Sequence, residues 1–243
     1  MTLIRLLLAA MLTGATLSSV QAQDCYYVVV FGAQRPLLNN PRHTHSFATF
    51  IHTRADGPTE YFTISWLPVD GNIRPSALFP EPGRNWGLEQ SLQWCQENRM
   101  EAASWGPYQI QQDLWNRAAA QKQWLESGNV SYKAMDGGST DGTVSNCIHA
   151  VSYMAREPGQ KIPYVFVMPA NWGESGSYWV ALTLRPWYVD PCNVRHDILR
   201  SIGQDPSSFK NGTLDRNPNF NPATRMIQDV LHRKLLPNRV TCD

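Results

Sequence analysis

Short apolar runs separated by turn-forming residues dominate the first third of the chain. Residues 26–31 (YYVVVF) are β-branched or aromatic throughout, which is typical of a strand. Residues 43–52 (HTHSFATFIH) place apolar side chains on both alternating faces, which predicts a buried, central strand. Residues 60–67 (EYFTISWL) follow the turn ADGPT and predict the next strand of a hairpin.

The rest of the chain mixes helical and extended patterns. Apolar residues recur at helical spacing over 88–100 and 113–126, and a helix starts near Cys147 and ends before Pro158. Further predicted strands are 105–110, 130–135, and a hairpin of 164–168 with 178–184; further predicted helices are 194–202 and 223–236. The pattern predicts an α+β fold with a mostly antiparallel sheet packed against helices.

The first residues have the organisation of a secretory signal peptide. Arg5 precedes the apolar run Leu6 to Leu12, and Val20-Gln21-Ala22 supplies small residues at the spacing of a cleavage site. We therefore expect a signal peptide over 1–22, a mature protein that begins at Gln23, and a secreted or periplasmic location. No later segment is long and apolar enough to span a bilayer, so we expect no integral membrane segment after cleavage.

The net charge of the chain does not indicate a charged partner. The chain has 21 basic and 20 acidic side chains, and Arg5 is the only charged residue of the predicted signal peptide. The mature chain is therefore neutral, which gives no electrostatic case for nucleic acid or an anionic membrane as a partner.

Five cysteines remain after the predicted cleavage, at positions 25, 95, 147, 192 and 242. An exported compartment favours disulfides, and an odd count leaves one free thiol. Cys147 opens an apolar helix, so we predict that it is the free thiol and that the other four form two disulfides. The favoured pair is Cys192 with Cys242.

Cys147 follows a flexible loop rich in Gly, Ser and Asp, within the stretch VSNCIHAVSYM. If Asn146 caps the helix, the thiol lies at its positive end, which favours the nucleophilic thiolate and predicts a pKa below the ordinary value of about 8.5. The alternative is a small buried core residue, because free cysteine is among the most buried residue types.

A nucleophilic thiol needs a base within hydrogen-bond reach. His149 lies about 200° around the helix from Cys147, so it does not face the same point. His45 begins the second strand, and a strand end beside a helix start brings imidazole and thiol together. A metal site that includes His43 is disfavoured, because Cys147 and His149 diverge and no carboxylate has ligand-like spacing.

Two segments resemble the motifs of one enzyme family. THSFATFI (44–51) resembles the histidine box of the lecithin–retinol acyltransferase family, and SNCIHAV (145–151) resembles its Asn-Cys-Glu-His box. These belong to the circularly permuted, NlpC-type papain-like thiol enzymes. The resemblance implies His45 as general base, Cys147 as nucleophile, and no cofactor. The family's third polar residue, often a histidine, falls on Ser65, which departs from that pattern.

The resemblance also guides our expectations of domain organisation and function. The resemblance covers the two boxes and the hairpin, and we expect a papain-like domain over 23–190 with a helical insert at about 86–128, followed by a helical and loop extension over 191–243 of the same domain. We expect an exported cysteine hydrolase or acyltransferase acting on an amide, ester or thioester, with envelope peptide or amide substrates favoured over lipids. Asn146, Asp136 and Trp172 are candidate substrate-binding residues. The alternative function is a non-catalytic envelope-binding domain on the same scaffold.

Overall fold

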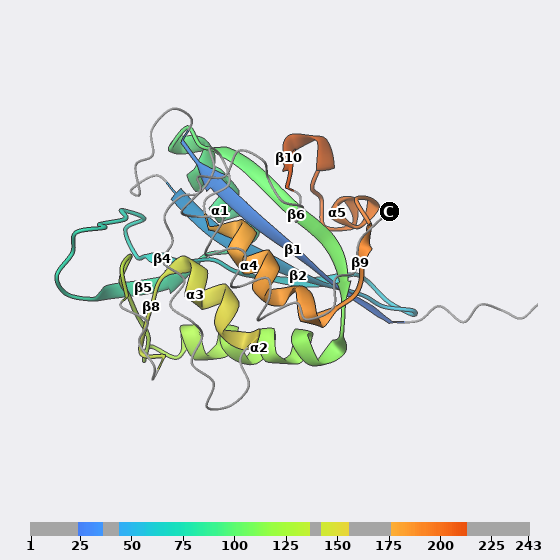
Figure 1. Ribbon diagram of the computed structural model, residues 1–243, viewed down its shortest axis with the longest axis horizontal. Helices are drawn as coiled ribbons and strands as arrows, with labels where there is room; N and C mark the ends of the chain where they lie inside the picture. Colours follow the sequence, from blue (N-terminus) through green and yellow to red (C-terminus); the bar gives the residue numbers. More distant parts are fainter. Residues whose placement is uncertain (1–23, 36–43, 137–141, 156–175, 213–243) are drawn as a thin grey trace, which may run out of the picture.

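The computed structural model describes residues 24–35, 44–136, 142–155 and 176–212, so the predicted signal peptide lies outside the described part (Figure 1). The main sheet has the order β10–β6–β1–β2–β3, and β9 also pairs with β6. Every pairing in it is antiparallel except that of β10 with β6. Its strands are β1 (Cys25–Gln34), β2 (Thr44–Thr53), β3 (Glu60–Ile64), β6 (Glu101–Ile110), β9 (Tyr188–Val194) and β10 (Lys210–Asn211).

A smaller second sheet leads directly into the helix that begins with Cys147. Its order is β4 (Trp66–Pro68), β5 (Glu81–Asn85), β7 (Ser131–Tyr132) and β8 (Val144–Ser145), and β7 and β8 run parallel. Helix α3 (Cys147–Ser152) begins two residues after β8 ends. The predicted strand over 60–67 is interrupted at Ser65, which lies between β3 in the main sheet and β4 in the small one.

Helices cover both faces of the main sheet (Figure 1). One core lies between the sheet and α2 (Gln112–Glu126), α3 and α4 (Ser177–Leu184). The other core lies between the sheet and α1 (Leu88–Glu97) and α5 (Asp197–Ser201). Short 3-10 turns follow or flank these helices at Tyr153–Ala155, Arg185–Trp187 and Pro206–Ser208.

Alternation along the central strands divides their side chains between the two cores. Val28 and Val30 of β1 pack on the α3 side, whereas Val29 and Phe31 pack on the α1 side. The interior residues of β2 are buried on both faces in the same way. The α+β fold with mostly antiparallel strands, and the buried second strand, are therefore confirmed.

Several predicted elements differ from the structure. Residues 178–184 form helix α4 rather than a strand, because a continuous apolar run does not by itself distinguish a buried strand from a buried helix. Its predicted partner strand, 164–168, and the predicted helix 223–236 lie outside the described residues. The predicted helix over 194–202 shortens to α5. The predicted helical insert contains α1 and α2, but also β6, which pairs directly with β1.

Candidate functional site

Cys147 is the first residue of α3, and Asn146 is its N-cap. The side-chain oxygen of Asn146 accepts hydrogen bonds from the backbone N–H groups of Ile148 at 2.9 Å and His149 at 2.8 Å. The predicted capping is therefore confirmed. An asparagine in extended conformation before the helix satisfies N–H groups that no helical carbonyl reaches, which fixes where the helix begins.

Cys147 is only 8% exposed as a residue, and the burial of its thiol controls the ionisation. Burial raises the pKa of Cys147 to about 11, although the nearby backbone N–H groups of Ser46, Cys147 and Ile148 favour the thiolate and act in the opposite direction. The prediction of a lowered pKa is therefore wrong in direction. The free-energy cost of removing the thiolate from water is larger here than the stabilisation that the N–H groups and the short helix give it.

His45 is fully buried on the α1 side of β2. Its Nε2 lies 2.8 Å from the hydroxyl oxygen of Ser65, and its ring stacks on Phe47 with the centroids 5.2 Å apart. Trp94 of α1 contacts the ring edge-on at 5.5 Å. Burial lowers the pKa of His45 to about 3, so the imidazole is neutral at physiological pH.

The predicted third residue, Ser65, does contact the imidazole, and it belongs to a longer chain of hydroxyls. The hydroxyl oxygen of Ser91 lies 2.7 Å from that of Ser65 and 2.7 Å from the carbonyl oxygen of Gly87. One hydroxyl proton cannot be donated to both. If Ser91 donates to Gly87, then Ser65 donates to Ser91, and Nε2–H of His45 donates to Ser65.

That direction of donation leaves Nδ1 of His45 without a proton, as a general base requires. Nδ1 is buried, and no hydrogen-bond partner reaches it within the described residues. A buried nitrogen with a free lone pair is uncommon, because most buried polar atoms are hydrogen-bonded.

Cys147 and His45 are neighbours through the backbone rather than through their side chains. The backbone N–H of Ser46, which lies near the Cys147 sulfur and favours its thiolate, belongs to the residue directly after His45. Cys147 lies in the core on the α3 side, and the His45 ring stacks on Phe47 of the α1-side core. No hydrogen bond joins the two side chains in the described structure.

A second buried pair, which the sequence did not predict, lies beside Cys147. Nδ1 of His149 is 2.5 Å from a carboxylate oxygen of Asp136, and the two side chains are 3% and 2% exposed. The same oxygen accepts the backbone N–H of Asn146 at 3.0 Å. His149 lies on another side of the helix from Cys147, as expected, and therefore does not pair with it directly. This expectation did not indicate that His149 pairs with Asp136 instead.

Tyr132 of β7 also lies close to the thiol. Burial raises the pKa of its phenol, and the negative charges of ionised Cys147 and Glu81 raise it further. Of the three predicted substrate-binding residues, Asn146 and Asp136 have the partners within the protein described above. Trp172 lies outside the described residues, so all three roles stay predictions.

The prediction of two disulfides is wrong for Cys25 and Cys95, which are free thiols. Cys95 faces the core beneath α1, where burial raises its pKa to about 12. Cys25 begins β1, and its sulfur contacts the side-chain amide of Gln109 at 3.8 Å. Cys192 is not among the free thiols of the described residues, and its pairing with Cys242, outside them, stays a prediction.

Within the described residues, no group of three or more His, Cys, Asp or Glu side chains is arranged to hold a metal ion. No helix in the same part of the chain has the length and hydrophobicity to cross a bilayer. No family model, curated protein or solved structure matches the chain.

Proposed function

We propose that this chain is a cysteine hydrolase or acyltransferase in which Cys147 attacks the carbonyl carbon of an amide, ester or thioester. His45 acts as the general base. One observation supports the proposal: helix α3, which begins with Cys147, packs on β2, which carries His45, and Nδ1 of His45 is buried without a hydrogen-bond partner among the described residues.

The two pKa values decide the form of the chemistry. Burial lowers the pKa of His45 to about 3 and raises that of Cys147 to about 11, so the resting pair is a neutral imidazole and a neutral thiol. The proton of Cys147 moves to Nδ1 of His45 as the sulfur attacks, which requires the two side chains, now on opposite faces of β2, to be brought together when substrate binds. This is general-base catalysis rather than reaction of a preformed thiolate.

The remaining steps use groups at the same place. The backbone N–H of Cys147 stabilises the negative charge that develops on the carbonyl oxygen. The C–N, C–O or C–S bond of the substrate breaks, the leaving group takes the proton from His45, and an acyl-thioester remains on Cys147. Water or another acceptor gives its proton to His45 and attacks this thioester, which releases the acyl group and restores the thiol.

The expected export of the protein favours peptide or amide bonds of the cell envelope as substrates, with lipids second. The competing function is a non-catalytic envelope-binding domain on the same scaffold. The burial of Cys147 and its raised pKa favour that alternative, because both are also the properties of a core cysteine.

An activated acyl ester separates the two functions. The Cys25→Ala protein, which lacks the half-buried free thiol, is incubated with p-nitrophenyl acetate, and the acetylated residue is located by peptide mass spectrometry. The proposal predicts acetylation of Cys147 that is lost in Cys147→Ala and kept in Cys95→Ala, the matched core thiol. Acetyl groups found only on lysines or the N-terminus would support the binding domain instead.

A further inference from the structure

Core packing alone does not explain why Asp136 and His149 are buried together beside Cys147. A carboxylate and an imidazole that are 2% and 3% exposed are costly to bury, and they persist only where their hydrogen bonds are satisfied. One carboxylate oxygen meets both Nδ1 of His149, at 2.5 Å, and the N–H of Asn146, at 3.0 Å. Asp136 therefore holds the helix from two points on either side of Cys147.

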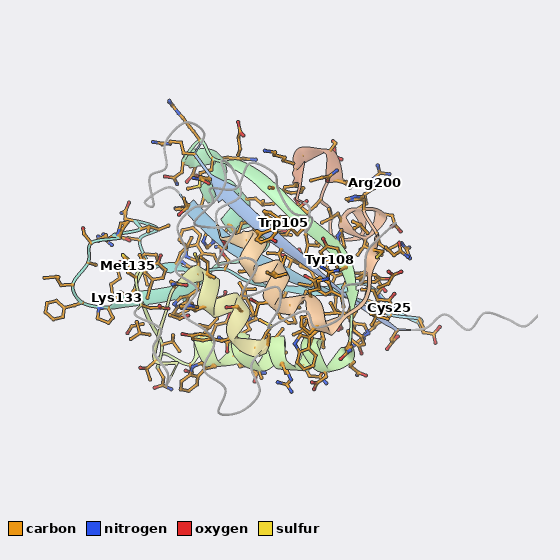
Figure 2. All side chains as sticks on the ribbon, in the orientation of Figure 1. Cys25, Trp105, Tyr108, Lys133, Met135 and Arg200 are labelled. Atoms are coloured by element: carbon orange, nitrogen blue, oxygen red, sulfur yellow. The ribbon has the colours of Figure 1, made fainter. Side chains whose placement is uncertain are left out.

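The segment that carries Asp136 is itself fixed at its other end. The N–H of Lys133 donates to the carbonyl oxygen of Ser145, and the Lys133 ammonium donates to the carbonyl oxygen of Leu78. Figure 2 shows Lys133 and Met135 together on the side of the molecule where the loop between β4 and β5 projects. The small sheet, the segment up to Asp136, and the start of α3 are thus one connected unit.

His149 completes the unit from inside the helix. Its ring is stacked on Tyr153 with the centroids 5.0 Å apart and the planes within 8° of each other. Its own N–H is bonded to the Asn146 side chain, so the cap and the imidazole constrain the same turn. Cys147 lies between these two anchored residues, and its backbone N–H has little freedom to change direction.

We infer that Asp136 and His149 are positioning residues that aim the backbone N–H of Cys147 at the carbonyl oxygen of a bound acyl substrate. This inference rests on the proposed function, because it assigns no chemistry to the pair itself. Its role is to prevent reorientation of the donor when charge develops on the oxygen, since preorganised donors are the ones that stabilise a transition state.

Two reagents that attack the same sulfur distinguish this role from a purely structural one. Acetylation by p-nitrophenyl acetate passes through an oxyanion, whereas alkylation by iodoacetamide does not. Both second-order rate constants at Cys147 are measured in the Cys25→Ala background for His149→Ala, His149→Gln, Asp136→Ala and Asp136→Asn. His149→Gln keeps an N–H that can donate to Asp136. Asp136→Asn keeps an oxygen that can accept from His149 and from the backbone N–H of Asn146.

We expect His149→Ala and Asp136→Ala to slow acetylation about 10- to 100-fold relative to alkylation. We expect His149→Gln and Asp136→Asn to recover part of this loss. Equal changes in the two rates, or no change in either, would overturn the inference. If an alanine variant does not fold, the amide variants decide the question by the same ratio.

The outcome is separable from that of the proposed function. A parent protein that is not acetylated at Cys147 refutes the proposed function and the inference together. A parent protein that is acetylated, with variants whose ratio of the two rates is unchanged, refutes only the positioning role.

Discussion

The hydroxyl oxygens of Ser65 and Ser91 lie 2.7 Å apart and connect helix α1 to the candidate base His45. Ser65 occupies the break between β3 and β4, so its hydroxyl is free to meet both the imidazole and the helix. The relay continues to the carbonyl oxygen of Gly87, the N-cap of α1. A serine can thereby orient a histidine without a charged third residue, through a buried chain of hydrogen bonds.

The relay predicts coupled effects of mutation. Ser65→Ala leaves Nε2 of His45 buried without a partner and should lower the free energy of unfolding by about 1–3 kcal/mol. Ser91→Ala should cost less, because Ser65 still contacts the imidazole. Urea unfolding of both single variants and the double variant measures the coupling. Strictly additive changes would show that the two hydroxyls do not act as one chain.

The buried imidazole predicts a loss of stability in acid. The pKa of His45 is lowered from 6.5 to about 3 in the folded protein, so only the unfolded chain takes up this proton between these values. The stabilisation is complete well above pH 6.5 and declines by about 1.4 kcal/mol for each pH unit below it. His45→Gln should flatten this slope in urea unfolding from pH 4 to 7.

The matched control for that experiment is His196→Gln, because His196 is exposed at the surface. Its acid slope should stay parallel to that of the parent protein. An unchanged slope in His45→Gln would show that His45 is not the buried neutral histidine described above.

The free cysteines predict a thiol count. If the predicted Cys192–Cys242 disulfide forms, unfolding in guanidinium with iodoacetamide, without reductant, should label Cys25, Cys95 and Cys147, which is three thiols per chain. In the folded protein Cys25 should react first, because Cys95 and Cys147 are buried. Peptide mass spectrometry reads both results, and a single labelled thiol would restore the two-disulfide arrangement that the sequence predicted.

Close packing of Trp66 on Gly83 supports the small sheet that leads to Cys147. A Cβ added to Gly83 would lie 2.2 Å from Cζ2 of the Trp66 ring, and that ring is almost completely buried. Gly83→Ala should therefore lower the free energy of unfolding by about 1–3 kcal/mol. Gly57→Ala, where the added carbon meets only the flexible Arg54 side chain, should change it by no more than about 0.5 kcal/mol.

The sequence predicted the elements whose formation depends on residue spacing or on a single capping side chain. The buried strand β2, the amphipathic helices α1 and α2, and the Asn146 cap each follow from spacing or from a single side chain. Helix α4 could not be predicted in this way, because an apolar segment that is buried on all sides shows no periodic alternation of apolar and polar residues. Its Ser177 hydroxyl donates to the carbonyl oxygen of Phe31, a contact that only the folded sheet provides.

The candidate site divides in the same way. The sequence indicated His45, Ser65 and Cys147, and the structure brings Ser65 to the imidazole. It did not predict the pKa of Cys147, because desolvation depends on how many elements cover the thiol. It also missed the Asp136–His149 pair, because 13 positions along the chain separate the partners and no spacing rule joins them.

The pH profile of acetylation tests the central claim, that neutral His45 removes the proton of Cys147 during attack. The rate constant with p-nitrophenyl acetate is measured at Cys147 in the Cys25→Ala protein and in the same protein with His45→Gln. Between about pH 5 and 9 the parent rate should be nearly constant, because the base stays neutral and the thiol stays protonated. The variant rate should be lower and rise about tenfold for each pH unit, because only the thiolate reacts. A parent rate that rises tenfold per unit together with that of the variant would contradict the claim.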